Sequence, residues 1–171
     1  MEGEIVRKQI KEDEKGNLIY FNFNGTKGGI PEIEKSEYNA IDYVSVNENG
    51  EILGRFIAYY SAWRRTVYSC EFVKFKEFIN SSNNKIENDS IFSEDIDNFM
   101  KMLLTEYCHK IKVVHFMTIA ENKNAIRRYD KWTNMFNGGR IGELYKYAID
   151  TYGKSHDVLL YEFRAMEVSD E

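Results

Sequence analysis

The sequence predicts an α/β fold in which a mostly antiparallel central sheet is flanked by helices. Three observations support this prediction. An Asn-Gly pair at 49–50 separates two strand-like runs, which is a strong hairpin signal. Apolar residues recur at helical spacing over 92–107, and two strand patterns, 140–149 and 156–163, would close the sheet. A chain of 171 residues with 43% hydrophobic residues is long enough for one core, so we expect one domain over residues 1–171.

The first 39 residues contain a predicted hairpin followed by a loop. Two apolar patches, Ile5–Val6 and Leu18–Phe21, lie on either side of a charged stretch. Residues 24–31 contain the only proline and three glycines, which is typical of a loop. A phosphate-binding loop is the alternative, but it would need a strand before it and a helix directly after it.

Residues 40–75 predict an antiparallel meander of three strands. The strands are expected at 40–46, 52–60 and 67–75, and they alternate with turns at 47–51 and 61–66.

A long amphipathic helix is predicted after a polar loop at 76–90. Ser90 or Ser93 would cap the helix, and acidic residues in its first turn would suit the positive end of the helix dipole. One face of this helix is apolar, and it is formed by Phe92, Ile96, Phe99, Met100, Leu103 and Tyr107.

The run from Val113 to Ile119 predicts a strand that is covered on both faces and parallel to the strand before the long helix. A second helix is expected at about 124–136, and Asn137–Gly139 would stop it. Its predicted buried side chains are Ile126, Tyr129, Trp132 and Phe136.

Charge and composition exclude several classes of protein. A formal charge of -5 and a pI near 5.4 predict no general nucleic-acid partner, although local basic patches at Arg64–Arg65 or Arg127–Arg128 remain open. No apolar run is long enough to cross a membrane, and the N-terminus lacks the pattern of a secretory signal. We therefore expect a cytoplasmic protein without a membrane partner.

The cysteines and histidines show no metal-binding spacing, so no metal site is predicted. Cys70 and Cys108 are interpreted as buried thiols rather than as catalytic or disulfide residues. His115 is either a hydrogen-bonded core residue or a base. His156 and Asp157 are either an orienting pair or a structural hydrogen bond.

The segment after the strand 113–119 resembles a known junction. Asn122, Ala125 and Tyr129 fall on the pattern with which the GNAT superfamily of acyl-CoA-dependent N-acetyltransferases passes from its fifth strand to its fourth helix, while Arg128 stands at an apolar position. The order of predicted elements is similar to the GNAT fold over residues 40–165.

This resemblance implies transfer of an acetyl group from acetyl-CoA directly to an amine of a small molecule or peptide. It implies that Tyr129 protonates the departing thiolate and that Glu71 takes the proton of the amine. It places the pantetheine arm along the backbone at Val73 and Phe75, with Asn122 facing the arm. The alternatives are a core tyrosine at 129, an outward-facing glutamate at 71, and an asparagine at 122 that closes the turn.

The chain departs from the family at the diphosphate loop. In the family this loop has the form Arg or Gln, two residues, Gly, one residue, Gly or Ala, and here Asn88, Ile91 and Ser93 stand at those three places, so the glycines are gone. The resemblance leaves Ser93 as the candidate residue for binding the diphosphate. Side chains would block the approach, and each nearby carboxylate would repel a diphosphate by about 1 kcal/mol or more. This favours a second hypothesis, a GNAT-like binding or assembly module without catalytic activity.

The segment that walls the acceptor pocket in the family is short in this chain. Only residues 24–39 are available for it. The pocket is therefore either open or completed by a second subunit in a homodimer.

Overall fold

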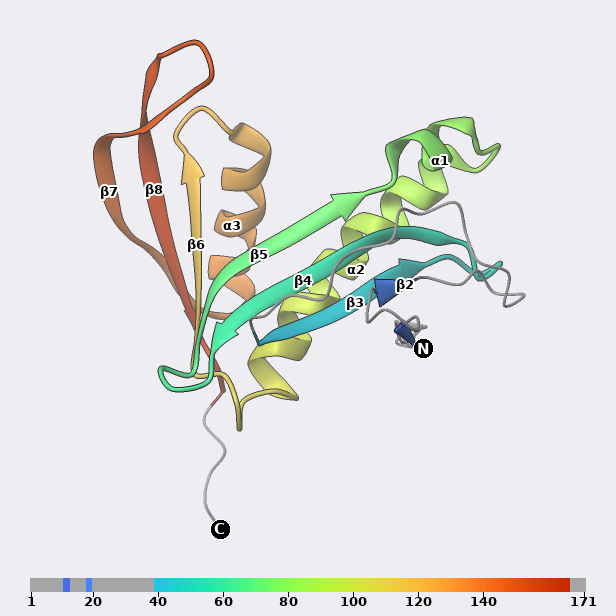
Figure 1. The fold of residues 1–171 in the computed structure, drawn as a ribbon, viewed down its shortest axis with the longest axis horizontal. Helices are drawn as coiled ribbons and strands as arrows, with labels where there is room; N and C mark the ends of the chain where they lie inside the picture. Colours follow the sequence, from blue (N-terminus) through green and yellow to red (C-terminus); the bar gives the residue numbers. More distant parts are fainter. Residues whose placement is uncertain (1–10, 13–17, 20–38, 167–171) are drawn as a thin grey trace. The chain divides into compact units, whose positions relative to one another are not determined.

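A computed structural model describes residues 11–12, 18–19 and 39–166 (Figure 1). In chain order the elements are β1 (Lys11–Glu12), β2 (Leu18–Ile19), β3 (Ala40–Val46), β4 (Ile52–Ser61), β5 (Thr66–Lys74), α1 (Lys76–Ser81), α2 (Lys85–Thr105), β6 (Val113–Ile119), α3 (Lys123–Met135), β7 (Asn137–Ile149) and β8 (Ser155–Arg164). Strands β3 to β8 are hydrogen bonded in the order β3-β4-β5-β6-β8-β7. The pair β5–β6 is parallel, whereas β3–β4, β6–β8 and β7–β8 are antiparallel. The predicted fold class is confirmed.

The chain folds into two compact units. Among the described residues, unit 1 comprises those before 60 together with 70–99, and unit 2 comprises 60–69 and 100–166. The prediction of one domain over residues 1–171 stays a prediction.

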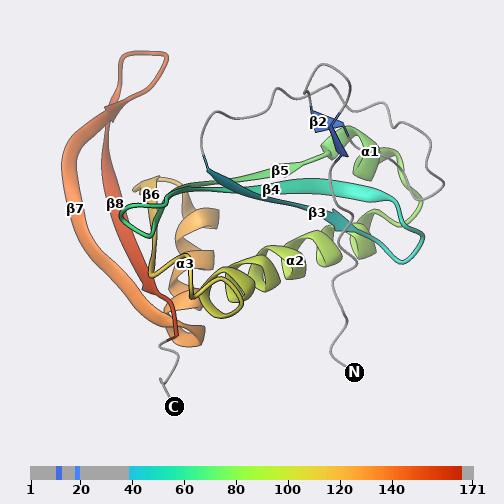
Figure 2. The ribbon, with the colours of Figure 1, turned by 60° about the horizontal axis from the view of Figure 1, so that its bottom comes forward.

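In unit 1, the β3–β4 hairpin has the predicted register and turn. The pairing runs from Ala40 opposite Tyr59 to Val46 opposite Ile52, and the turn is closed by the N–H of Gly50, which donates to Asn47 O at 2.9 Å. Gly50 has a φ of 77°, which glycine adopts without strain. The first part of α2 lies along one face of this hairpin (Figure 2). Its rings Phe92 and Phe99 each lie 5.4 Å from Phe56, centroid to centroid.

The prediction of a loop at 76–90 is wrong. Helix α1 occupies 76–81, and α2 begins at Lys85, so neither Ser90 nor Ser93 caps it. The first turns of α2 carry no apolar stripe because their inward residue is Asn88, which accepts a hydrogen bond from Asn47 Nδ2 and donates one to Ser82 Oγ. From Phe92 onward the predicted stripe is confirmed by five buried residues, whereas Tyr107 lies beyond the end of the helix.

In unit 2, α3 covers one face of the strands β6, β8 and β7 (Figure 2). Phe116 lies 5.3 Å from Trp132 and 6.1 Å from Phe163, centroid to centroid, and all three side chains are buried. The prediction that both faces of β6 are covered is wrong, since Met117 and Ile119 on the other face are 57% and 36% exposed.

The segment Asn137–Gly139 does not form a loop after α3. The helix ends at Met135, and β7 begins at Asn137, directly after Phe136. Gly138 has a φ of 156°, and a Cβ atom there would overlap the carbonyl oxygen of Glu162 on β8. Glycine therefore allows the strand to start immediately after the helix.

The described part of the N-terminal region is a small antiparallel pair. Lys11–Glu12 pairs with Leu18–Ile19, so the first strand of this pair comes from the charged stretch and not from the predicted apolar patch Ile5–Val6. Ile5, Val6 and the loop at 24–31 lie outside the described residues.

Candidate functional site

The junction between β6 and α3 is closed by Asn122. Its Oδ1 accepts a hydrogen bond from the N–H of Ala125 at 3.2 Å, and its carbonyl accepts the N–H of Ile126 at 3.1 Å. This is an N-cap, the turn-closing role that the sequence offered as an alternative. The Nδ2 group of Asn122 has no partner in the described part of the chain and lies on an exposed residue.

Tyr129 lies two turns along α3 and is half-buried. Its ring is 5.0 Å from Phe116, 5.1 Å from Tyr161 and 5.5 Å from Trp132, measured between centroids. Three aromatic neighbours from β6, β8 and α3 therefore fix the ring, while part of the side chain remains accessible to solvent.

The parallel strands β5 and β6 are paired only at their first residues. Thr66 pairs with Val113, and Val67 pairs with Val114. The next residues in unit 2, Tyr68 and Ser69 on β5, have no partner on β6, and the side chain of Tyr68 is half exposed.

Unit 1 holds the other predicted site residues. Glu71 and Val73 are two residues apart and lie on the same exposed face of β5. Glu71 has no ion pair among the described residues. Both backbone groups of Phe75 are engaged, because its N–H donates to Leu53 O at 2.9 Å and its carbonyl accepts the N–H of Ile79. Phe75 therefore has no open backbone group for an added strand, and Val73 is the better candidate.

The residues that were aligned with the diphosphate loop lie inside α2 rather than before it. Asn88 is in its first turn, Ile91 is in its second turn, and Ser93 is in its third turn. The helix actually begins beside two lysines, Lys74 and Lys85, both of which pair with Asp89. The hydrogen bonds from Lys74 and then Lys85 lower the pKa of Asp89. Two lysine side chains therefore lie at the start of α2, where Asp89 pairs with both and Glu87 is in the first turn.

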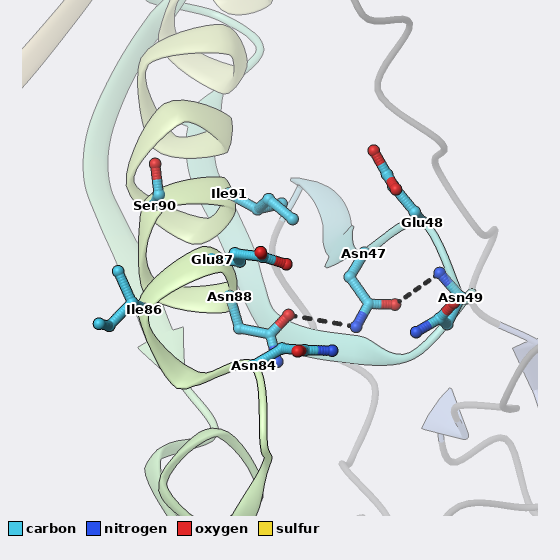
Figure 3. A pocket seen from close by; sticks show the side chains of 9 residues that line it. All are labelled: Asn47, Glu48, Asn49, Asn84, Ile86, Glu87, Asn88, Ser90 and Ile91. Carbon is cyan, nitrogen blue, oxygen red and sulfur yellow. Dashed lines mark hydrogen bonds between the residues drawn. The ribbon is translucent and has the colours of Figure 1, made fainter.

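A pocket of about 710 Å³ lies at the start of α2 and the β3–β4 turn (Figure 3). Four asparagines and two glutamates contribute to its lining, together with isoleucine and serine side chains. Inside the protein, Asn47 Nδ2 lies 3.2 Å from Asn88 Oδ1, and Asn47 Oδ1 accepts the N–H groups of Asn49 and Glu51. The amides at its base thus hold the hairpin turn onto α2, and the sequence did not predict this pocket.

His156 does not pair with Asp157, so the prediction of an orienting pair is wrong, whereas the alternative, a structural hydrogen bond of His156, is confirmed with other partners. Its Nε2 lies 2.7 Å from Asp150 Oδ2, and its Nδ1 lies 3.1 Å from Glu121 Oε2. Asp150 and then Glu121 raise the pKa of His156, while His156 lowers the pKa of both carboxyl groups. Because Glu121 precedes the cap residue Asn122, this cluster ties the start of α3 to the β7–β8 hairpin. These three residues stand at positions 121, 150 and 156, and their spacing in the sequence does not identify them as neighbours in the fold.

A second polar network lies on the α3 side of the sheet. The guanidinium of Arg140 donates to Tyr161 Oη at 3.1 Å, and Tyr161 donates to Asp130 Oδ1 at 3.0 Å. Burial raises the pKa of Tyr161, which therefore stays protonated and able to donate. The network fixes the ring against which Tyr129 lies.

The remaining predicted polar residues have structural surroundings. His115 Nε2 lies 3.0 Å from Glu162 Oε1 on the neighbouring strand. The partner of His115 is therefore a carboxylate rather than a group in the core. Cys70 and Cys108 are free thiols, as predicted, but both are half-buried rather than fully buried. Among the described residues, no group of three or more histidine, cysteine or acidic side chains could hold a metal ion. No helix in the described ranges is long and apolar enough to span a membrane.

Comparison with known proteins identifies the fold. No protein-family model and no curated protein sequence matches the chain. Among solved structures, the chain is similar to RimL, a ribosomal L7/L12 alpha-N-protein acetyltransferase in complex with coenzyme A, with a TM-score of 0.53 and 16% identity. The similarity covers 75% of this chain and 63% of RimL, which is less than two thirds of that protein.

A variant of the spermidine N-acetyltransferase SpeG from Vibrio cholerae is similar with a TM-score of 0.49 and 13% identity, over 73% of this chain and 65% of SpeG. Apart from helix α1, which the sequence did not predict, the order of strands and helices from β3 to β8 is the predicted one. The chain therefore has the fold of the GNAT superfamily.

Proposed function

We propose that this protein is an acyl-CoA-dependent N-acetyltransferase that transfers an acetyl group directly from acetyl-CoA to an amine. The observation that supports the proposal most strongly is the β6–α3 junction. There a capped helix start presents Tyr129 on a rigid aromatic platform within a GNAT fold.

Each site residue has a proposed role in this reaction. Amine attack on a thioester needs one proton removed from the amine and one proton given to the departing sulfur. Glu71 is proposed to take the first proton, directly or through water, and the hydroxyl of Tyr129 to give the second. The unpaired amide NH2 of Asn122 and the backbone of Val73 are proposed to hold the pantetheine arm.

The diphosphate is proposed to bind at the start of α2 rather than at Ser93. Lys74 and Lys85 are close enough to share Asp89, and both could turn toward a phosphate group. Residues 75–91 contain no glycine, so backbone amides contribute less there than in a glycine-rich loop.

The second candidate function is a binding or assembly module that has lost acetyl-CoA. The specific observation in its favour is this missing glycine loop, together with Glu87 in the first turn of α2, which repels a diphosphate.

Thermal unfolding in the presence of acetyl-CoA distinguishes the two candidates. A ligand at 100 times its Kd stabilises the folded state by about 2.7 kcal/mol. We expect 1 mM acetyl-CoA to raise the Tm and desulfo-CoA to raise it by a similar amount. An unchanged Tm would support the module and contradict the enzyme.

Kinetics then test the proton donor. Tyr129→Phe keeps the ring and removes the hydroxyl, so we expect kcat to fall by about 10²-fold or more with little change in KM for acetyl-CoA. Tyr147→Phe, an exposed tyrosine on β7, is the matched control. Equal kcat values for the Tyr129→Phe variant and the unmodified protein would remove Tyr129 from the mechanism.

A further inference from the structure

Three segments that are far apart in the sequence meet at one end of unit 2. The turn between β4 and β5 contacts the segment between α2 and β6, because Arg65 Nη2 donates to His109 O at 2.6 Å and Lys112 N donates to Arg65 O at 2.7 Å. The end of β8 joins them through Ala165 N, which donates to Lys112 O at 2.8 Å. Figure 1 shows the β4–β5 turn beside the start of β6. We call this surface the basic tip, and it comprises Trp63, Arg64, Arg65, His109, Lys110 and Lys112.

The two segments 62–66 and 106–112 have a net positive formal charge although the whole chain is acidic. Residues 62–66 and 106–112 contain four arginines and lysines and one acidic residue, Glu106. Arg64, Lys110 and Lys112 have no ion pair within residues 39–166. The guanidinium of Arg65 is different, since it is held by the carbonyls of Cys108 and His109 and serves to join the two segments.

The basic tip also exposes a tryptophan. Trp63 is 86% exposed, whereas Trp132, the other tryptophan, is fully buried. The guanidinium carbon of Arg64 lies 5.6 Å from the centroid of the Trp63 ring. A cation beside an accessible indole ring is an arrangement that favours stacking of a flat, electron-rich group.

We propose that the basic tip binds single-stranded nucleic acid, with a base stacked on Trp63 and phosphates paired with Arg64, Lys110 and Lys112. Every nucleotide carries both a planar ring and a negative charge, so one polymer satisfies both features of the surface. An acidic peptide offers charge without a ring at each residue. An anionic membrane would require a broader apolar surface than one indole beside polar side chains.

This proposal revises the expectation of no nucleic-acid partner. That expectation depended on the net charge of the chain, which averages over the whole surface. Phosphates interact mainly with charges within a Debye length of about 10 Å, so a local group of cations can bind them despite distant acidic residues.

The basic tip is separate from the proposed acetyl-transfer site. It lies at the start of β6, whereas Asn122 follows the end of that strand. A strand of seven residues is about 20 Å long. Substitutions at the basic tip can therefore be tested without altering the residues proposed for catalysis.

The test measures fluorescence anisotropy of labelled 12-nucleotide oligo(dT) and oligo(rU) with the full chain. Three phosphate contacts predict a slope of about -2 for log K against log salt, or a loss of about 20-fold in affinity between 50 and 200 mM salt. Lys110→Gln should reduce the magnitude of this slope by about 0.7.

The tryptophan is tested by truncation and by rescue. Trp63→Ala should weaken binding by about fivefold to 150-fold, and Trp63→Phe should restore most of it. Tyr152→Ala and Lys154→Gln are the matched controls, because both residues are exposed in the β7–β8 turn at the opposite end of the sheet. Both controls should bind the oligonucleotides as the unmodified protein does.

Several outcomes would overturn the proposal. These are a lack of oligonucleotide binding at 50 mM salt, equal losses in the controls, and unchanged binding by Trp63→Ala. Trp63-dependent binding to phosphatidylserine vesicles or to a poly-glutamate peptide, without oligonucleotide binding, would assign the surface to a membrane or an acidic protein instead. Because Trp63 is exposed, its variants should keep the Tm of the unmodified protein, and their acetyl-CoA response reports separately on the proposed enzyme.

Discussion

The two long helices in the described part of the chain begin in different ways. Helix α3 starts at Lys123, immediately after a capping asparagine, and its contacts with the cap lie within four residues. Helix α2 starts at Lys85, and its first turn is held by Asn47, which lies 41 residues away in the chain. A helix start can be recognised in a sequence when the side chain that accepts its backbone N–H groups is a near neighbour in the chain. It cannot be recognised when the contacts come from a hairpin that is distant in the sequence.

The largest expected effect comes from breaking the start of α2. Asn88→Ala removes a buried partner of Asn47 and of Ser82, so we expect a loss of about 1–3 kcal/mol in the free energy of unfolding. Urea titration measures it. Asn83→Ala, an exposed asparagine before the helix, is the control and should change stability by less than about 0.5 kcal/mol. If both variants are equally stable, the Asn47–Asn88 contact does not hold this helix.

Breaking the start of α3 should cost less. Asn122→Ala removes the cap and is expected to cost about 1 kcal/mol, whereas Asn122→Gly should cost only a few tenths. Hydrogen exchange sharpens the comparison, because Asn122→Ala should speed amide exchange in the first turn of α3 and leave α2 unchanged. A loss in the glycine variant as large as that in the alanine variant would show that the cap is not the cause.

The start of α3 also has one distant contact, the ion pair of Glu121 with His156, and this contact makes its stability depend on pH. Because Asp150 and Glu121 raise the pKa of His156 above its ordinary value of 6.5, the stabilisation is complete below pH 6.5 and is lost as the pH rises through the raised value. The lowered pKa values of the two carboxyl groups add stability that is lost in acid.

Unfolding of the unmodified protein and of His156→Gln, compared from pH 5.5 to 9, checks this dependence. We expect the difference in stability between the two proteins to shrink as the pH rises. A difference that does not change with pH would contradict the ion pair.

The smallest expected effect lies at the surface of α2. Lys85→Ala removes an i,i+4 ion pair with Asp89, and Lys74 remains to pair with that carboxylate. The expected loss is about 0.3–0.5 kcal/mol at low salt and near zero at 1 M salt. A larger loss, or one that salt does not reduce, would mean that Lys85 supports the helix start through another contact.

The sequence by itself determined the order of the strands and helices from β3 to β8 except for α1, because alternation, helical spacing, the Asn-Gly turn and the Asn122 cap are local patterns. It also identified the junction that carries Tyr129. It did not predict the beginning of α2, since a buried asparagine with a distant partner leaves no apolar period. It assigned His156 to its sequence neighbour, whereas the folded chain brings Asp150 and Glu121 to it.

Only the tertiary structure decided which charges lie together. Arg64 and Lys110 are 46 residues apart in the chain, and the net charge of -5 gives no indication of a local positive surface. Hydrogen bonds from Arg65 and Lys112 to the backbone join the two segments that contain these residues. Contacts between segments that are distant in the sequence depend on how the whole backbone folds. No local sequence pattern therefore predicts them.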